Sequence, residues 1–282
     1  MDRDPGPGAA DFTCGTLSYD GHKGTDFALP TLAAMRAGVD VLAAAPGTVQ
    51  AIRDALPDIA SSAPDAPDLN GQDCGNGVLI SHGGGWETQY CHLKRGSVSV
   101  RTGQRVGKGT VLGQVGLSGR TEFPHVHLTL RHDGQVIDPF DPAPGPATCN
   151  GTHAASLWQH PVGYRAGGLI GVGIANSVPE FDAIEAGLDT PGSLPTDAPA
   201  LVVWGQAFGG RAGDVVVLTL TGPQGAVLRH SETLPRDKAR YFRAAGKRAG
   251  GKWPEGTYEA QVRIIRDGAE ISRRAATFRI TR

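Results

Sequence analysis

The sequence Pro-His-Val-His-Leu-Thr-Leu, at residues 124–130, decides the fold class. In a β-strand, successive side chains point to opposite faces. One face of this stretch is therefore apolar, with Val126, Leu128 and Leu130. The other face carries two imidazoles and a hydroxyl, from His125, His127 and Thr129. We expect a strand that packs its apolar face into a core and presents the two histidines side by side.

A second stretch, upstream, supplies further side chains of the kind that bind metals. Residues 21–27 read Gly-His-Lys-Gly-Thr-Asp-Phe and place His22 and Asp26 four positions apart. Gly24 between them makes a bend easy, so both side chains can reach one site. Zinc hydrolases usually hold the metal with three nitrogen or oxygen ligands. His22, Asp26 and one histidine of the 125/127 pair meet this requirement, and the other histidine can act as a general base.

A hairpin that ends in a third candidate histidine is predicted between these stretches. Residues 77–82 and 86–92 read as strands, and three consecutive glycines separate them. If the hairpin abuts the same site, His92 can hydrogen-bond an oxyanion or protonate a leaving amine. Isolated histidines are usually surface or structural residues, and we interpret five of them in this way: His82, His132, His153, His160 and His230.

The composition favours a globular chain rich in β-structure. The 282 residues include 41 Gly and 20 Pro without a collagen-like period, which predicts many turns. A hydrophobic fraction of 39% and a charged fraction of 20% suit a packed core. Lys and Arg number 27 against 28 Asp and Glu, so the net charge of -1 gives no nucleic-acid signature. No apolar run approaches the roughly 20 residues of a membrane span.

Two β units are predicted, separated by a linker. Residues 13–141 read almost entirely as strands, and a Pro-rich segment follows them. Residues 142–198 are expected to be a linker with a short helix, which begins with a capping box at 177–180 and ends at Gly187. From 199 to 282, short strands at regular spacing predict a small β-sandwich.

The C-terminal unit also carries a weak sign of its type. Its segment Gly256-Thr257-Tyr258 is similar to the tyrosine corner of immunoglobulin-like domains. It shows no cluster of histidines, cysteines or paired acids, so we expect a binding or spacer module.

Four separated cysteines bear on the compartment. They stand at Cys14, Cys74, Cys91 and Cys149, and none forms a C-x-x-C pair. They allow three disulfide pairings, which favours an oxidising compartment, and four buried free thiols are the alternative. Residues 1–5 lack the apolar segment of a signal peptide. We therefore expect either a cytosolic protein or one whose leader has been removed.

Three spaced motifs together resemble lysostaphin/LytM-type zinc metallopeptidases, which are peptidoglycan endopeptidases. The motifs are His22–Asp26, the hairpin end Tyr90-Cys91-His92, and His125-Val126-His127 after Gly119 and Pro124. The glycine-spaced segment 103–116 matches the usual lead-in to the last motif. The resemblance covers residues 13–141 and implies an antiparallel β-sheet core with the metal in a groove.

The resemblance also implies roles for individual residues. The zinc ligands would be His22, Asp26 and His127, and His92 and His125 would be the catalytic pair beside the attacking water. The reaction would be hydrolysis of peptide bonds in peptidoglycan stem peptides or cross-links, outside the cytoplasm, in the periplasm or after secretion. The expected disulfides and the lack of a known glycine-bridge-binding module favour D-Ala–diaminopimelate cross-links over glycine bridges.

Two departures from the family lead to further expectations. Cys91 stands where the family often has glycine or alanine, so we expect it in a disulfide with Cys74. Cys14 would then pair with Cys149. The loop at residues 54–73 is longer than the usual connection and is expected to narrow the groove.

Other classes of function stay open. One alternative is a non-catalytic or autoinhibited wall-binding or regulatory protein on the same fold, with residues 54–73 or 142–194 occluding the groove. Another is a biotinyl- or lipoyl-type carrier, suggested by the short glycine-spaced strands of 103–116. Lys108 is poorly placed for such a carrier, and the histidines would be unexplained. The C-terminal module is a candidate site for a protein partner.

Overall fold

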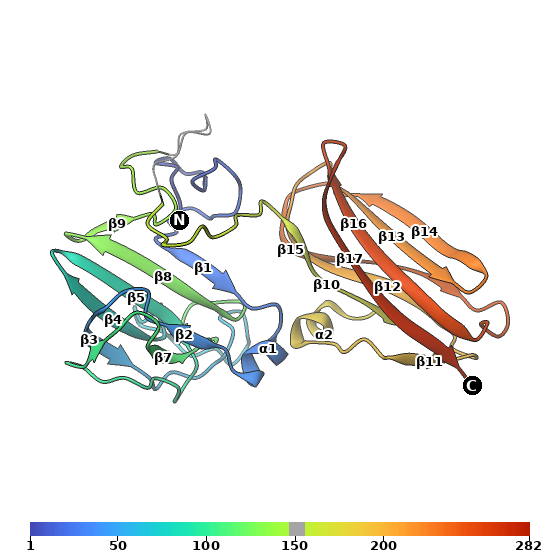
Figure 1. The fold of residues 1–282 in the computed structure, drawn as a ribbon, viewed down its shortest axis with the longest axis horizontal. Helices are drawn as coiled ribbons and strands as arrows, with labels where there is room; N and C mark the ends of the chain where they lie inside the picture. Colours follow the sequence, from blue (N-terminus) through green and yellow to red (C-terminus); the bar gives the residue numbers. More distant parts are fainter. Residues whose placement is uncertain (147–155) are drawn as a thin grey trace. The chain divides into compact units, whose positions relative to one another are not determined.

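The chain separates into two compact units, Met1–Gly163 and Tyr164–Arg282, in a computed structural model that describes residues 1–146 and 156–282. Both units consist mainly of antiparallel β-sheet, which confirms the predicted fold class (Figure 1). No helix among the described residues has the length and hydropathy of a membrane span.

The first unit holds nine strands and one short helix within its described residues. Their bounds are β1 Thr25–Ala28, α1 Leu32–Ala37, β2 Asp40–Leu42, β3 Gly47–Arg53, β4 Asn76–Gly83, β5 Trp86–Leu93, β6 Arg105–Val106, β7 Val111–Gln114, β8 His125–His132 and β9 Gln135–Ile137. The predicted hairpin is β4–β5, with positive φ at all three turn glycines. Helix α1 was not predicted, although Thr31 caps its start and Gly38 its end.

The main sheet of this unit places β8 between β1 and β5. Its strand order is β1-β8-β5-β4-β3-β6, with β9 on β8, and the described pairings are antiparallel. His127 lies opposite Asp26 of β1 on one side and opposite Cys91 of β5 on the other. The register therefore brings the three predicted motifs together where β1, the start of β8 and the end of β5 lie side by side.

The apolar face of β8 packs into the core of the first unit, as its alternation predicted. Leu128 belongs to that core, and Val126 packs against it. The other core residues come from β2 to β7 and the turns between them: Val41, Ala43, Val49, Val78, Ile80, Tyr90, Leu93, Val100, Val106, Leu112 and Val115. The opposite face of β8 is not open to solvent either, because His125 and Thr129 are buried. The histidines thus lie in a recessed site.

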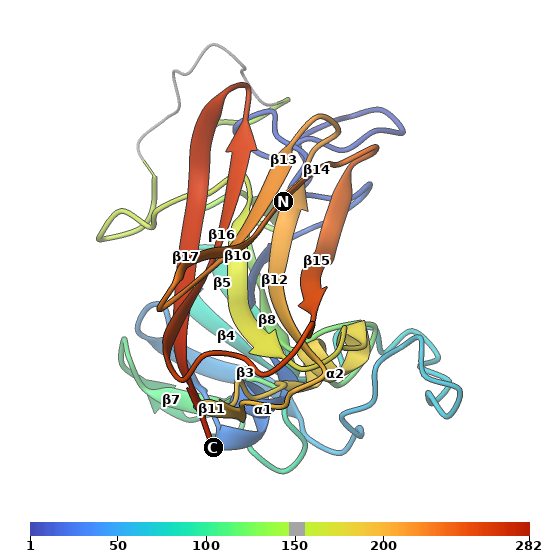
Figure 2. The same ribbon diagram turned by 90° about the vertical axis from the view of Figure 1, so that its right-hand side faces the viewer.

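The second unit contains the remaining helix and eight strands. Their bounds are β10 Gly168–Ala175, α2 Phe181–Ala186, β11 Ser193–Pro195, β12 Ala200–Gly210, β13 Val215–Gly222, β14 Gly225–Thr233, β15 Lys238–Arg248, β16 Gly256–Arg266 and β17 Ala269–Thr281. They form a three-stranded sheet, β10-β12-β15, and a five-stranded sheet, β11-β17-β16-β13-β14. Figure 2 shows the two sheets facing each other, and residues of both fill one apolar core.

The tyrosine predicted to form a corner behaves as that motif requires. Tyr258 is buried, and its hydroxyl donates to the Pro254 carbonyl oxygen at 2.9 Å, four residues upstream. The assignment of the unit to the immunoglobulin-like class stays a prediction.

The segment expected to be a linker contributes to the sheets of the second unit. Strand β10 pairs along its length with β12, and Leu169 and Ile174 belong to the core. The helix α2 ends at Gly187 as predicted. Its predicted capping box was wrong: the N-cap is Glu180 rather than Ser177, and no side chain caps it. The division into domains at 142 and 198 stays a prediction, and the boundary between the compact units falls at 163/164.

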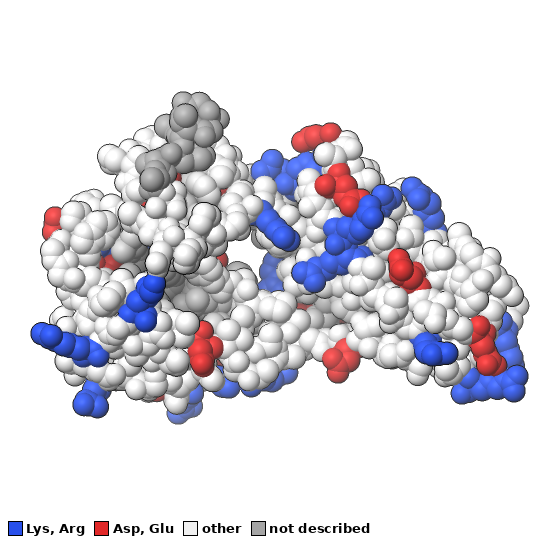
Figure 3. Space-filling model, in the orientation of Figure 1, with Lys and Arg blue, Asp and Glu red and all other residues white. Residues whose placement is uncertain are grey.

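Charged side chains of the second unit are interspersed on the face drawn in Figure 3. Among the ion pairs of this unit, the Glu270 carboxylate lies 3.5 Å from the Arg263 guanidinium and 2.9 Å from that of Arg273. Both signs of charge therefore share this surface.

Candidate active site

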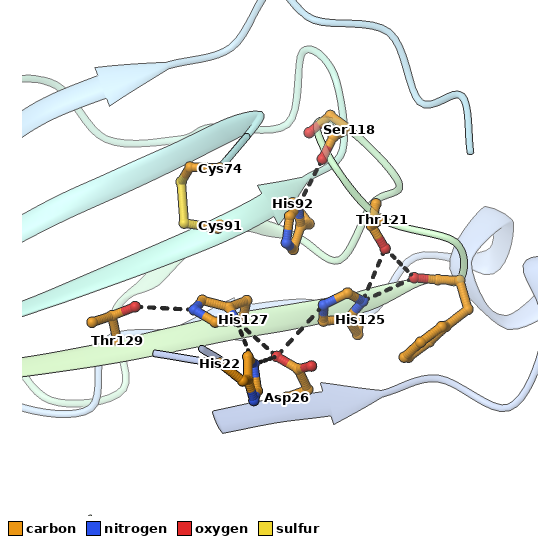
Figure 4. Close-up of polar contacts among 11 residues, drawn as sticks. His22, Asp26, Cys74, Cys91, His92, Ser118, Thr121, His125, His127 and Thr129 are labelled. Atoms are coloured by element: carbon orange, nitrogen blue, oxygen red, sulfur yellow. Dashed lines mark hydrogen bonds and ion pairs between the residues drawn. A yellow bond between two sulfur atoms is a disulfide. The ribbon is translucent and has the colours of Figure 1, made fainter. Parts of the chain in front are cut away.

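Three predicted ligand atoms converge at the centre of the β1–β8 pair (Figure 4). The His127 Nδ1 lies 2.8 Å from the Asp26 Oδ1, and the His22 Nε2 lies 3.1 Å from each of these atoms. Two imidazole nitrogens and a carboxylate oxygen that point at one spot are a donor set suited to zinc. The residues present therefore fit a metal ion.

Strand register explains why Asp26 and His127 meet, and a glycine explains why His22 can join them. Asp26 and His127 are directly opposed in β1 and β8. A Cβ atom at Gly24 would lie 2.4 Å from the His127 Nε2 and 2.7 Å from the Leu128 carbonyl oxygen. The glycine is thus required because the backbone approaches the His127 ring closely. This differs from the expected reason, an easy bend.

Asp26 is held in its charged form. Burial alone would raise the pKa of its carboxyl group. Hydrogen bonds with His127 and His22 and the nearby charge of His125 outweigh that effect and hold the pKa well below its usual range. An ionised carboxylate is the form that coordinates a cation.

The second ring nitrogens of His127 and His22, which are not among the three converging atoms, differ in their hydrogen-bond partners. The His127 Nε2 lies 3.0 Å from the Thr129 Oγ1, the next side chain on the same face of β8. Such a contact from the second nitrogen fixes the ring of a metal-binding histidine. The His22 Nδ1 is buried and has no hydrogen-bond partner among the described residues, while Tyr19 stacks on the ring at 4.4 Å.

His125 faces the same cluster from the end of β8. Its Nε2 lies 3.6 Å from the Asp26 Oδ1. Its Nδ1 lies 2.9 Å from the Phe123 carbonyl oxygen and 3.1 Å from the Thr121 Oγ1. Burial lowers the pKa of His125, although Asp26 and the Phe123 carbonyl act in the opposite direction.

His92 enters the site from the end of β5, in an unusual backbone conformation. Its φ is 62°, in the left-handed region that non-glycine residues rarely adopt. Its Nδ1 lies 2.8 Å from the Ser118 carbonyl oxygen, and its ring centroid is 4.7 Å from that of His125. Burial, together with the neighbouring His125, lowers the pKa of His92 to about 4. The structure therefore brings both predicted catalytic histidines to the ligand cluster.

Backbone carbonyls set the tautomer of both imidazoles. A carbonyl oxygen can only accept a hydrogen bond, so the Nδ1 of His92 donates to Ser118 and the Nδ1 of His125 donates to Phe123. In the neutral rings the Nε2 atoms then carry lone pairs. The lowered pKa values keep both rings neutral, so two nitrogen lone pairs stand next to the three ligand atoms. This arrangement suits the removal of a proton from a water molecule.

A second group of nitrogens also satisfies the geometry of a metal site. His92, His125 and His127 each offer a nitrogen within 4.8 Å of the others. This group lacks a carboxylate, whereas His22, Asp26 and His127 include one and approach more closely. We therefore propose that His22, Asp26 and His127 hold the metal.

The predicted disulfide fixes the strand that carries His92. Cys74 and Cys91 form a disulfide, with Cα atoms 4.8 Å apart. The His92 backbone N–H also donates to the Cys74 carbonyl oxygen at 2.8 Å. Cys91 and His92 are thus both tied to the end of the 54–73 loop. The predicted partner of Cys14, Cys149, lies outside the described residues, as does His153.

The loop at residues 54–73 supports the segment that holds the catalytic histidines. The Leu117 N–H donates to the Asp58 Oδ1 at 2.8 Å. The Ser61 N–H donates to the Thr121 carbonyl oxygen at 2.8 Å, and the Arg120 N–H to the Asp73 carbonyl oxygen at 2.8 Å. The loop therefore braces residues 117–121 from both of its ends.

Several supporting residues were not predicted from the sequence. Ser118 and Phe123 act through their carbonyl oxygens, which every residue has, so no sequence signal marks them. Thr121 and Thr129 could have been suspected from their spacing to His125 and His127. Asp138 accepts from the Phe140 N–H at 2.9 Å, as expected of an Asp-Pro turn at a strand end.

Comparison with known proteins adds a family context for this unit. Residues 20–139 match the model of Peptidase family M23. The peptidoglycan DD-endopeptidase ShyA of Vibrio cholerae serotype O1 is 32% identical over 117 residues, which are 42% of this chain and 22% of that protein. The cell division protein DipM of Caulobacter vibrioides is 42% identical over 72 residues, 24% of this chain and 12% of that protein.

The chain thus spans less than a quarter of the length of either relative. Among solved structures, a zinc containing peptidase from Vibrio cholerae aligns at 27% identity with a TM-score of 0.32, covering 44% of this chain and 31% of that one.

Proposed function

We propose that the protein is a zinc-dependent endopeptidase of bacterial peptidoglycan, and the match of residues 20–139 to the model of Peptidase family M23 supports this proposal. The substrate is the D-Ala–diaminopimelate cross-link, cleaved by water. The observation that carries the proposal is the convergence of His22, Asp26 and His127 beside two imidazoles with basic Nε2 atoms. The proposed location is the periplasm or the cell exterior, where the Cys74–Cys91 disulfide is stable.

The metal ligands in this proposal are His22, Asp26 and His127. When bound, zinc activates water and polarises the scissile carbonyl group. Asp26 offsets the positive charge of the ion, and the Thr129 hydroxyl fixes the ring of His127.

His125 and His92 move the protons. The His125 Nε2, which faces the ligand atoms, accepts a proton from the attacking water. His92 cannot donate from Nε2 in its neutral form, because its Nδ1 holds the proton that bonds to Ser118. The leaving amine can therefore be protonated only after the first proton transfer, when an imidazole has taken up a proton that it can donate. The lowered pKa of each ring makes the protonated form a good acid for that step.

Metal analysis together with digestion of purified sacculi tests the proposal. We expect about one zinc per chain and release of new stem-peptide ends that a chelator abolishes. The masses of the products identify the bond. Release that persists in chelator would refute the metal-dependent mechanism. Zinc without release would favour the non-catalytic alternative.

Two observations weigh against parts of the alternative functions. The apolar residues of 142–194 that could occlude a groove belong to β10, which is hydrogen-bonded to β12 in the second unit. For a carrier, a lysine at the tip of a hairpin is needed. Lys108 lies between β6 and β7, which belong to different sheets, and its Nζ donates to the Gln159 Oε1. The second unit is proposed as a binding or spacer module.

A further inference from the structure

A polar pocket lies next to the segment that holds the catalytic histidines. Its volume is about 470 Å³, and it is lined by Ile59, Ser61 and residues 66–70 of the long loop and by Gly119, Arg120 and Glu122. Gly119 in its wall directly follows Ser118, whose carbonyl oxygen accepts from His92. Glu122 in its wall precedes Phe123, whose carbonyl oxygen accepts from His125. Two residues of the pocket wall are therefore direct sequence neighbours of the residues whose carbonyl oxygens hold His92 and His125.

The wall of the pocket is fixed relative to the catalytic histidines. The Ser61 N–H donates to the Thr121 carbonyl oxygen at 2.8 Å. At Gly119, where φ is +84°, a Cβ atom would lie 2.4 Å from the Asp73 carbonyl oxygen. The loop and the 119–122 segment are thus in close contact. A residue bound in the pocket would be held at a defined distance from the reacting bond.

The lining carries one cation and two anions. The Arg120 side chain is 71% exposed, and its Nε lies 3.1 Å from the Asp73 Oδ1. A guanidinium has five N–H donors, and this contact engages one of them. Asp68 accepts from the Asn70 N–H at 3.1 Å, and Glu122 accepts from the Ser61 hydroxyl at 2.8 Å. Each of these contacts involves one carboxylate oxygen, and a carboxylate has a second.

We propose that this pocket binds the zwitterionic end of the diaminopimelate side chain that precedes D-Ala in the donor stem, and that Arg120 selects for its carboxylate. The proposal rests on the proposed function and assigns a substrate residue to this pocket. The donor diaminopimelate ends in one carbon that carries both an ammonium and a carboxylate group. Arg120 matches the carboxylate with a planar fork of donors, and Asp68 and Glu122 match the ammonium. Lysine at the same stem position would lack the carboxylate.

The test uses three soluble cross-linked peptide dimers with the same scissile bond. The donor residue before D-Ala is diaminopimelate, diaminopimelate with an amidated side-chain carboxylate, or lysine. The readout is kcat/KM for each dimer with the full chain. The wild-type protein should prefer free diaminopimelate over the other two by about tenfold, because hydrogen bonds to a charged acceptor are stronger than those to a neutral one.

Substitution of the arginine should remove this preference. In Arg120→Gln the ratio of diaminopimelate to amidated substrate should fall to within about twofold of unity, because the charged donor is lost. Arg120→Lys should keep part of the ratio, because it retains the charge without the fork. Arg101→Gln, a matched change at an exposed arginine outside the pocket lining, should leave the ratio as in the wild type.

The outcomes separate this proposal from the proposed function. If the wild type cleaves all three dimers equally, or if Arg120→Gln keeps the full ratio, the pocket assignment is refuted and the endopeptidase stands. If the metal-loaded wild type cleaves none of the dimers, the proposed function fails and the pocket assignment fails with it.

Discussion

The two compact units are built from the same kind of sheet but bury different kinds of side chain. The second unit encloses a continuous apolar core, and only Gln206 and Asp214 are polar residues buried there among those described. The first unit has a smaller apolar core and buries many polar groups, including His22, His92, Thr121, His125 and Thr129. Buried polar groups cost stability unless they are fully bonded. The first unit thus buries polar side chains that a sheet with only a structural role would leave out of its interior.

Two carboxylates, buried Asp214 and partly buried Asp26, make the same contrast. Asp214 in the second unit receives two hydrogen bonds from the Arg266 guanidinium, at 2.8 and 2.7 Å, and forms a satisfied ion pair. Asp26 in the first unit is surrounded by three imidazoles instead. Imidazoles can release their protons and bind a metal, whereas a guanidinium cannot. An acid paired with arginine, like Asp214, therefore indicates a structural role, whereas an acid among histidines, like Asp26, indicates a site.

The largest effect on zinc content and activity is expected from removing His127, which belongs to both candidate groups of metal ligands. His127→Ala should lose zinc and activity together, because its Nδ1 is one of three converging atoms. Metal analysis and muropeptide release measure both. His82→Ala is the control, because His82 contacts the Pro46 carbonyl and the Thr88 hydroxyl outside the cluster. Zinc retained at the wild-type level in His127→Ala would contradict the ligand assignment.

A smaller effect should follow from removing the proposed base. His125→Ala should keep zinc and lose on the order of 10²-fold or more in kcat, because the proton acceptor is gone while the ligands remain. Steady-state kinetics and metal content measure the two properties. If this variant loses the metal instead, the roles within the 125/127 pair are reversed.

A core substitution in the second unit should have the opposite result, a loss of stability without a loss of zinc or activity. Leu218→Ala should lower the free energy of unfolding of this unit by about 3 kcal/mol, because a fully buried side chain leaves a cavity. Zinc content and kcat should stay unchanged. Urea unfolding followed by tryptophan fluorescence measures the loss, with Leu188→Ala at a 36% exposed leucine as the matched control. A drop in kcat in the folded variant would show that the units depend on each other.

The smallest expected effect is a pH dependence of the stability of the second unit. Burial alone would raise the pKa of Asp214, but hydrogen bonds from Arg266 and from the Arg211 backbone outweigh it and lower the pKa. A folded-state pKa below the unfolded value of about 3.9 stabilises the unit above that pH, and this stability is lost as the pH falls through the folded value. Unfolding measured between pH 5 and 3 should show the loss in the wild type. Asp214→Asn should be less stable at pH 5 and change less with acidification.

Sequence patterns were informative where chemistry and periodicity coincide. The alternation of residues 124–130 predicted both the core face of β8 and the pair of imidazoles on the other. The glycine turn predicted the β4–β5 hairpin. The resemblance supplied the Cys74–Cys91 pairing, which spacing alone left open.

Other features could not be found because they depend on neighbours in space. Strand β15 is rich in Lys, Arg and Ala and does not alternate as a strand usually does; it forms because β12 offers a paired edge. Strand β10 mixes three glycines with aliphatic residues without strict alternation, and it too is fixed by its pairing with β12. The left-handed backbone of His92 has no sequence signal, because it is imposed by the bonds at Cys74, Cys91 and Ser118.

The long loop divides into parts that can vary separately. Asp58 and Ser61 near its start and Asp73 at its end carry the bonds that brace the catalytic segment. The pocket-lining residues 66–70 lie between these anchors. Insertions, deletions or exchanges confined to this middle part can reshape the pocket while the braces stay in place. The loop thus offers a natural point for grafting, where new substrate preference can be introduced into an unchanged catalytic frame.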